Sequence, residues 1–463
     1  MSMSNYDRRH FLGTVSAATG AAGLGLLRPA MAGPVRPIVG DVSKPAVLGG
    51  APVRTKRYPS WPVFEDSDRK AWKDVLESGH WNRGPRVAEF EKKWGEALGV
   101  RYVTATSCGT SALMAALTAL DIGPGDEVIV PPYTFIATIN VVFMKHALPI
   151  FVDTDRRTHQ VDATKIEAAV TDKTRCIIPV HLGGNPANMD VVLATAKKKN
   201  VPVIEDACQA HFAEWRNKRV GGLGDMGCFS FQASKNLNSA EGGAVLTNNG
   251  DYAVVCRSFQ DVGRNYHLDE NGDLNRYGKP GWNYGRNGDN RRMTDFQGTI
   301  LLGQLSRLEA QSRVREQNAE YLAKRLKEIG GVIPAEKYEG TTRHAYHLFM
   351  AKYDAEHFAG MTRLQFMKAM RAEGVGCGSG YPPINKEPYM KELVESRGFR
   401  RIYSEKEIQS WIERNHCPEN DKLCEDGIWW GQTTLLAERS GMDDISNAVE
   451  KIKKNADAIK KAV

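Results

Sequence analysis

The sequence predicts an α/β protein in which helices flank a mostly parallel sheet, with a smaller α/β domain in the C-terminal part. Short apolar runs alternate with helical patterns between residues 110 and 247, and such alternation is typical of a parallel sheet covered by helices on both faces. A long helical pattern at 296–330 then leads into the second domain. The expected strands are 127–131, 148–153, 175–180, 201–205, 226–231 and 243–247, and the expected helices between them are 110–120, 135–146, 162–170 and 188–199.

Changes in composition along the 463 residues predict the domain organisation. A chain of this length suggests two or three domains. Residues 33–62 are rich in Pro and Gly and are interpreted as an exposed leader. Residues 250–295 are polar without a clear period, which predicts either a functional loop or disorder. We therefore expect a leader at 33–62, a large domain at 63–330 and a small domain at 331–463. Within the large domain, an amphipathic helical pattern starts at about residue 84.

The overall composition excludes several classes of function. Hydrophobic residues make up 41% and charged residues 25% of the chain, and both values are ordinary for globular proteins. The formal net charge of +7 includes no long block of like charge, so no nucleic-acid partner is predicted. No stretch of about 20 strongly apolar residues occurs, which excludes a protein with several membrane spans.

The eight cysteines form no recognisable metal or disulfide framework. No Cys-x-x-Cys occurs and no Cys/His cluster has zinc spacing, so no metal site is predicted. Cys417 and Cys424 are able to form a bridge in an oxidising compartment, and the sequence leaves this question open.

The first 32 residues resemble a twin-arginine signal peptide. Arg8 and Arg9 precede a weakly apolar, Gly/Ala-rich stretch that runs to Leu27, and Ala30 and Ala32 frame an Ala-x-Ala cleavage pattern. The alternative is an N-terminal segment with a chance pair of arginines. We expect an exported, periplasmic protein cleaved after Ala32, and otherwise a cytoplasmic one.

Two features predict close approach of the backbone to an anion. Residues 107–112 place Thr110 and Ser111 at the start of a predicted helix. A helix N-terminus attracts anions such as phosphate, although the same residue types are common as plain helix caps. The paired glycines at 242–243 precede a predicted strand and allow close backbone approach.

Asp206 and Lys235 each lie at or just beyond the end of an apolar strand. Ligands bind at the carboxyl ends of strands in open α/β sheets, and a buried carboxylate there needs a cation. The protonated pyridine nitrogen of pyridoxal phosphate is such a cation, although Asp206 equally suits the cap of the next helix. Lys235 would act as an amine nucleophile if burial lowered its pKa; the alternative is a surface lysine.

Together, these features resemble the DegT/DnrJ/EryC1/StrS family of sugar aminotransferases. The most specific segments are 131–138, 205–211 and 229–243, and the resemblance runs from about Leu48 to about Ile459. It implies fold type I, the aspartate aminotransferase-like fold with a seven-stranded sheet. It also implies pyridoxal 5'-phosphate as cofactor, and transfer of an amino group from glutamate or glutamine to a keto sugar or cyclitol.

The resemblance also assigns roles to residues. Lys235 would be the Schiff-base lysine and carry a proton during catalysis, and Asp206 would pair with the pyridine nitrogen. The other residues expected around the cofactor are Phe135 and Gln209 on the two sides of its ring, and Gly109, Thr110, Ser111 and Ser230 at its phosphate. Asn290 and Arg292 match the family's Gly-x-Asn-x-Arg, whose Asn reaches the phosphate in the neighbouring subunit, so a homodimer with shared active sites is implied.

The segment near residue 380 departs from relatives that act on nucleotide sugars. Many of those relatives carry His-Tyr, whereas this chain has Gly380 and Tyr381. That pattern is more similar to relatives that aminate inosose cyclitols, and an insertion at about 262–287 is a further departure. Export also favours a free sugar or cyclitol, because activated nucleotide sugars are not expected outside the cytoplasm.

Three residues are candidate substrate contacts on this resemblance, namely Tyr381, His347 and Arg292. His347 suits a structural role equally well. A lysine at position 235 favours amino transfer over the dehydration performed by relatives that have histidine there. Another pyridoxal-phosphate reaction, such as dehydration or racemisation, and an exported non-catalytic ligand-binding protein of the same fold are the alternatives.

Overall fold

The computed structural model describes residues 41–276 and 284–463. The proposed signal at 1–32, the first part of the leader and residues 277–283 of the insertion lie outside these ranges. Within them, no helix has both the length and the apolar character needed to cross a membrane.

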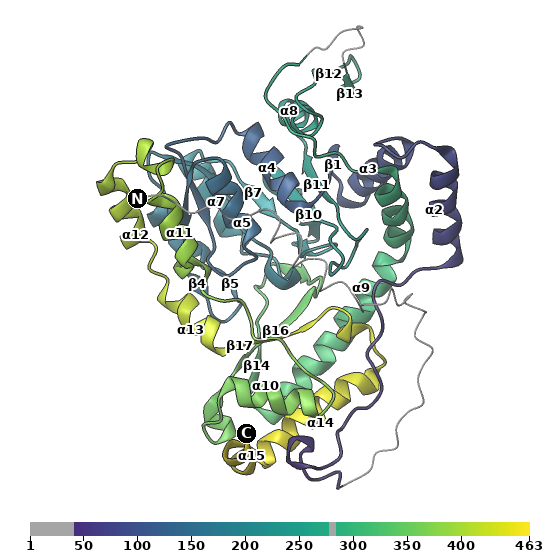
Figure 1. Cartoon of the computed structure of the whole chain (residues 1–463), viewed down its shortest axis with the longest axis vertical. Coiled ribbons are helices and arrows are strands. Elements are labelled where there is room, and N and C mark those ends of the chain that lie inside the picture. The colour runs from purple at the N-terminus through teal and green to yellow at the C-terminus, as the bar shows by residue number, and fades with distance from the viewer. Residues whose placement is uncertain (1–40, 277–283) are drawn as a thin grey trace, which may run out of the picture. The chain divides into compact units, whose positions relative to one another are not determined.

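The large domain is built on two sheets, one of which contains β1, β7, β10 and β11 (Figure 1). A pair of backbone bridges joins this sheet to the other one. One sheet has the order β1-β11-β10-β7, and the other has the order β3-β2-β6. Single parallel bridges join Ile177 to Val203 and Val180 to Asp206, where β6 faces β7. Their strands are β1 Tyr102–Thr106, β2 Glu127–Val130, β3 Leu148–Phe151, β6 Thr174–Ile177, β7 Ile204–Asp206, β10 Met226–Ser230 and β11 Gly243–Thr247.

Most neighbouring strands in these sheets run parallel. The pairs β2/β3, β2/β6 and β7/β10 are parallel, whereas β11 runs antiparallel to both β10 and β1. All six expected strands are present, which confirms the prediction of an α/β fold. The sequence did not predict β1, because its two threonines and one tyrosine interrupt the apolar run that marks a buried strand.

Helices pack against these strands, and local sequence explains where they begin. Asn188 accepts a hydrogen bond from Val191 N at the start of α7, and Thr294 and Gln297 form a capping box at the start of α9. Helix α4 packs on β10 and β11 and also contacts α8. The helices of this domain are α2 Asp66–Ser78, α3 Pro85–Leu98, α4 Gly109–Ala119, α5 Ala137–Met144, α6 Ile166–Ala169, α7 Met189–Lys199 and α8 Gly250–Gln260.

The small domain has an antiparallel sheet of order β14-β16-β17 beside the long helix α9, Asp295–Ile329. Its core joins the C-terminal part of α9 to α10, α14 and α15. The remaining helices are α10 Arg363–Ala372, α11 Pro388–Val394, α12 Glu405–Arg414, α13 Pro418–Asp426, α14 Arg439–Lys454 and α15 Ala456–Ala462. Its strands are β14 Val332–Pro334, β16 Leu348–Tyr353 and β17 Gly427–Gly431.

Short elements complete the described chain. The short strands are β4 Thr154–Asp155, β5 Gln160–Val161, β8 Glu214–Trp215, β9 Lys218–Arg219, β12 Tyr266–Leu268, β13 Leu274–Arg276 and β15 Thr341–Arg343. The 3₁₀ helices are η1 Ala46–Leu48, η2 Ala163–Lys165, η3 Leu182–Gly184, η4 Ala355–Phe358, η5 Ile384–Lys386, η6 Phe399–Arg401 and η7 Thr434–Leu436.

The structure differs in part from two expectations about loops in the described residues. The leader is not exposed throughout, because Ala51 is only 1% exposed and Glu373 accepts hydrogen bonds from the backbone of Ala46 and Val53. Its apolar side chains pack on the small-domain core. The polar region from residue 250 is partly regular, since it begins with α8 and its insertion forms the β12–β13 hairpin.

Residues 384–417 follow the small-domain part of the chain but pack on the large domain. Ile384, Phe399, Ile408, Trp411 and Cys417 belong to the same buried cluster as the strands β2 and β3. The domain boundaries at 63–330 and 331–463 therefore remain a prediction from sequence, and this segment crosses between the two cores. All eight cysteines have free thiols, Cys417 and Cys424 included.

Candidate active site

Lys235 lies in a tight turn between β10 and β11. Its N–H donates to the carbonyl of Gln232 at 2.8 Å, and Ala233 N donates to the carbonyl of Ala240 at 2.8 Å. Burial lowers the pKa of the Lys235 amine, an effect that Cys208 and Asp206 oppose. The structure therefore holds this amine in surroundings that favour its neutral, nucleophilic form.

Asp206 ends β7 as a buried carboxylate that is only 5% exposed. Oδ2 accepts a hydrogen bond from Thr138 Oγ1 at 2.8 Å, and Oδ1 accepts one from Cys208 N at 3.2 Å. No salt bridge to Asp206 is found in the part of the chain that the structure describes. A buried carboxylate in this position favours a cationic ligand, because burial without a counter-charge is costly.

Glu205, the residue before Asp206, anchors the end of β7 from the other face. Its carboxylate is fully buried and accepts hydrogen bonds from Gly221, Leu223 and Gly224 N at 2.6–2.7 Å. His181 Nδ1 accepts a hydrogen bond from Ala187 N, so the imidazole proton is on Nε2. His181 Nε2 therefore donates a fourth hydrogen bond to the Glu205 carboxylate at 3.0 Å. This role of Glu205 was not predicted from the sequence, although an acidic pair directly after an apolar run is a signal for it.

The N-terminus of α4 faces Ser230 at the end of β10. A Cβ on Gly109 would lie 2.7 Å from Ser230 Cβ, which shows how closely the two meet. Thr110 is half-buried at the same helix end. Ser111 is fully buried and its Oγ lies 3.0 Å from Ser107 Oγ, so the hydroxyl already has a protein partner. The structure thus brings together Gly109, Thr110 and Ser230, while the phosphate role of all four residues stays a prediction.

Gln209 and Phe135 have different environments. Gln209 is buried, and its Oε1 accepts from Gly183 N at 2.8 Å while its Nε2 donates to Tyr381 Oη at 3.1 Å. Phe135, just before α5, is 56% exposed. Packing of either side chain on a cofactor ring stays a prediction.

Two of the candidate substrate residues, Tyr381 and His347, also have different environments. Tyr381 lies beside Gln209, and burial raises its pKa to about 12. His347 is buried with Nδ1 at 3.3 Å from Asn236 Oδ1, and burial together with the nearby charge of Lys235 holds its pKa well below the usual range. Both residues therefore remain uncharged near neutral pH.

Asn290 and Arg292 lie in the segment that leads to α9. Arg292 forms an ion pair with Asp261 at 2.8 Å, so its guanidinium has a protein partner. Asn290 is exposed and its backbone forms a bridge with Asp261. The substrate role of Arg292 and the phosphate role of Asn290 stay predictions.

These features fit a bound pyridoxal phosphate. A buried carboxylate without a salt bridge to any described residue suits the pyridine nitrogen, an amine whose pKa is lowered by burial suits the aldehyde, and the N-terminus of α4 suits the phosphate. No group of three or more His, Cys, Asp or Glu residues suitable for a metal is found within the two described ranges.

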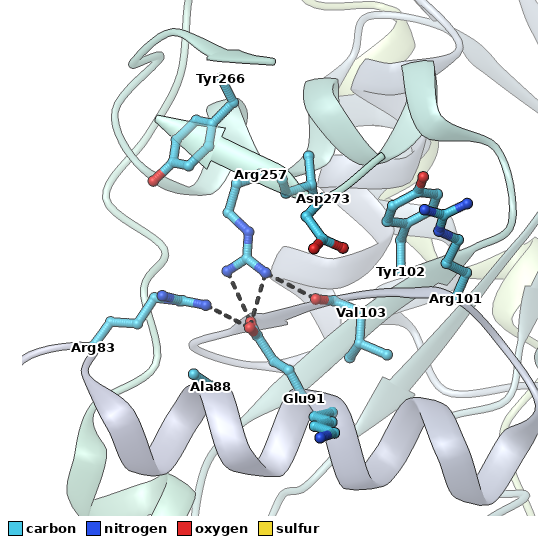
Figure 2. A pocket seen from close by; sticks show the side chains of 11 residues that line it. Arg83, Ala88, Glu91, Arg101, Tyr102, Val103, Arg257, Tyr266 and Asp273 are labelled. Carbon is cyan, nitrogen blue, oxygen red and sulfur yellow. Dashed lines mark hydrogen bonds and ion pairs between the residues drawn. The ribbon is translucent and has the colours of Figure 1, made fainter. Parts of the chain in front are cut away.

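A separate cavity of about 460 Å³ lies between α3, α8 and the β12–β13 hairpin (Figure 2). Glu91 lies at its centre and binds Arg257 at 2.8 Å and also Arg83, while Arg257 donates to the carbonyl of Val103 at 2.9 Å. None of the predicted site residues lines it. The arrangement ties helix α3 to strand β1 and explains the burial of these charges.

Comparison with known proteins identifies the family. Residues 63–417 match the model of the DegT/DnrJ/EryC1/StrS aminotransferase family. The chain belongs to this family. It is therefore an aminotransferase of the pyridoxal-phosphate-dependent type, as the resemblance implied.

The individual relatives described next match this chain over nearly their whole length. The chain is 34% identical over 427 residues to the L-glutamine:2-deoxy-scyllo-inosose aminotransferase of Streptoalloteichus tenebrarius, covering 88% of this chain and 97% of that protein. It is 31% identical over 424 residues to the L-glutamine:scyllo-inosose aminotransferase of Streptomyces griseus, covering 89% and 97%. A solved structure of 3-amino-5-hydroxybenzoic acid synthase superposes with a TM-score of 0.75 at 29% identity, covering 87% of this chain and 99% of that one.

Proposed function

We propose that the protein transfers an amino group from glutamine or glutamate to the ketone of a cyclitol such as an inosose. The observation that carries the proposal is that the Lys235 amine, whose pKa burial lowers, lies close enough to feel the charge of the buried Asp206 carboxylate, and that this carboxylate has no salt bridge among the described residues. The two inosose aminotransferases described above support the choice of donor and acceptor, since they match nearly the whole chain.

The chain's own residues would divide the work. Asp206, oriented by Thr138, would keep the pyridine nitrogen protonated, and the N-terminus of α4 would bind the phosphate. When bound, pyridoxal phosphate supplies a ring that stabilises negative charge at the amino acid's α-carbon. Lys235 would hold the cofactor at rest and, once displaced by the donor, carry the proton to or from the reacting carbon.

We also propose that the two sheets act as one seven-stranded, mostly parallel sheet of order β3-β2-β6-β7-β10-β11-β1. The parallel bridges between β6 and β7 support this continuity. A homodimer with shared active sites would use the exposed Asn290 toward the partner's phosphate. Mixing Lys235→Ala and Asn290→Ala subunits tests this, because only mixed dimers would then contain one complete site.

Export through a twin-arginine pathway is part of the proposal. A protein that folds around its cofactor before crossing a membrane fits that pathway, and an unphosphorylated cyclitol or sugar fits a periplasmic enzyme. Cell fractionation of the full chain and of an Arg8→Lys, Arg9→Lys double variant tests the proposal. If the full chain and the double variant divide between cytoplasm and periplasm in the same proportions, the arginine pair does not direct export and the proposal is contradicted.

The deciding experiment is a visible spectrum of the purified holoenzyme before and after addition of glutamine or glutamate. We expect a yellow band that bleaches with the amino donor and returns when scyllo-inosose is added. Lys235→Ala should lack the wild-type band and turnover, whereas the exposed Lys218→Ala should keep both. A band indifferent to amino donors would instead indicate another pyridoxal-phosphate reaction.

A further inference from the structure

Figure 2 shows a pocket of which one wall is the β12–β13 hairpin, part of the insertion at about 262–287. Two hydrogen bonds tie this hairpin to the start of β1. Tyr102 Oη donates to Gly272 O at 2.9 Å, and Arg101 Nη2 donates to Asn271 O at 2.7 Å. The hairpin therefore encloses a cavity of about 460 Å³ against α3 before any ligand binds, and cavities of this size hold small molecules.

The floor of the pocket carries an excess of positive charge. Glu91 accepts hydrogen bonds from Arg257 Nη1 and Nη2 at 2.8 and 2.9 Å, from Arg83, and from Ala105 N at 2.8 Å. Burial alone would raise the pKa of Glu91, but the charges of Arg257 and Arg83 outweigh it and hold this pKa below its usual value. Asp261, which also influences Arg257, has ion pairs with two other arginines. One carboxylate at the floor thus balances two guanidinium groups.

The rim of the pocket adds two cations and one anion. Lys92 of α3 and Arg101 are exposed there, and so is Asp273 of the hairpin. None of these three side chains forms a salt bridge with any residue in 41–276 or 284–463. The pocket is therefore lined by four cationic and two anionic side chains, and its lining has a net positive charge.

This lining suits an oxyanion as ligand. Guanidinium groups bind carboxylate and phosphate groups through paired N–H donors, and a lysine ammonium adds a point charge. A cationic ligand is disfavoured, because Glu91 already accepts four hydrogen bonds and Asp273 alone among the lining acids is left to pair with it. An apolar ligand is disfavoured as well, because it would remove charged groups from water without pairing them.

We propose that this pocket binds a small polar molecule through its phosphate or carboxylate group, with Arg83 at the floor and Lys92 and Arg101 at the rim as the binding residues. The inference is independent of the proposed amino transfer, because no residue assigned to that reaction lines the pocket. The ligand is held mainly by charge, so its binding weakens as the salt concentration rises.

Isothermal titration calorimetry of the holoenzyme with inorganic phosphate and with malonate, at constant ionic strength, tests the inference. Excess cofactor is removed beforehand, and the bound cofactor keeps both ions away from the start of α4. We expect saturable binding of at least one ion, with one site per chain. Binding of phosphate alone would assign a phosphate as the recognised group of the ligand, and binding of malonate alone would assign a carboxylate.

Variants at the floor and at the rim locate the bound ion. Arg83→Met and Lys92→Met should each weaken binding by about tenfold, as for the loss of one hydrogen bond to a charged group. Lys93→Met is the matched control, because Lys93 is the next residue of α3, pairs with Glu89 and does not line the pocket. Asp273→Asn should instead strengthen binding by about threefold, since it removes an exposed negative charge from the rim.

Absence of saturable binding to the wild-type holoenzyme would overturn the inference. Equal weakening in Lys92→Met and Lys93→Met would overturn it too, because general surface charge would then hold the ions. Weaker binding in Asp273→Asn would do the same, since the carboxylate would then attract the ligand. Melting temperatures show whether Arg83→Met stays folded, and if it does not, the two rim variants decide the outcome, because they change exposed side chains.

Discussion

Replacing Gly243 with alanine should displace the helix end that we expect to bind the cofactor phosphate. Gly243 begins β11 and is paired with Thr106 on β1 and Ser230 on β10. A Cβ at this position would lie 2.4 Å from the carbonyl carbon and oxygen of Cys108 and 2.7 Å from Gly109 N. These are backbone atoms, so no rotation of a side chain relieves the contact.

The size of the effect follows from these distances. Ordinary contacts begin at 3.4 Å, so the start of α4 must withdraw by about 1 Å. Overpacking of this kind costs about 1–3 kcal/mol of folding free energy. A shift of about 1 Å also lengthens hydrogen bonds from the helix N–H groups to a phosphate, and we expect about a tenfold loss of pyridoxal phosphate affinity, or about 1.4 kcal/mol.

The assay titrates cofactor-free protein with pyridoxal phosphate and follows absorbance, and urea unfolding of the same samples reports stability. Gly123→Ala is the matched control, because a Cβ there meets nothing within 4 Å. If Gly243→Ala binds pyridoxal phosphate as tightly as Gly123→Ala, the phosphate does not bind at the start of α4. An unchanged free energy of unfolding would refute the clash itself.

Three further predictions concern buried charges. Because burial lowers the pKa of Lys235, its amine in the cofactor-free protein should react with an acylating reagent at a lower pH than the amine of the exposed Lys218 does. Mass spectrometry across a pH series measures both reactions, and the same pH dependence for the two lysines would contradict the prediction. Glu205→Gln places an amide N–H₂ group against backbone N–H groups that now donate to the carboxylate. The free energy of unfolding, measured with urea, should fall by about 3 kcal/mol, and a fall of less than about 1 kcal/mol would contradict a stabilising role of these hydrogen bonds. Arg257→Met leaves Glu91 with half its pairing, so we expect a loss of about 3–5 kcal/mol, and stability near wild type would show that Arg83 alone suffices.

Much of the large domain was predictable because its strands are buried on both faces. Such strands are short continuous apolar runs, and the helices between them have their own period. Strand β1 and helix α8 were missed for the opposite reason. The threonines of β1 hide its burial, and α8 presents only Ala253, Cys256 and Phe259 as a buried apolar stripe within a polar segment.

The chemistry of the site was predictable where one residue type is required by the cofactor, as for Lys235 and Asp206. Contacts that depend on tertiary structure were not. Nothing in the sequence shows that Tyr133 Oη fills the space beside Gly380, or that Gln209 connects to Tyr381. The same limit applies to residues 384–417, whose apolar pattern indicates a buried face without indicating which domain buries it.

The segment at residues 46–54 has a consequence for how the chain is completed during synthesis. Ala51 O accepts from Lys451 Nζ across 400 positions of sequence, and Arg54 pairs with Asp444 of the same late helix, α14. This segment therefore leaves the ribosome long before its partners on α14 have been synthesised. It must remain open to solvent and to other proteins until translation has ended, and the small domain closes only as a post-translational step.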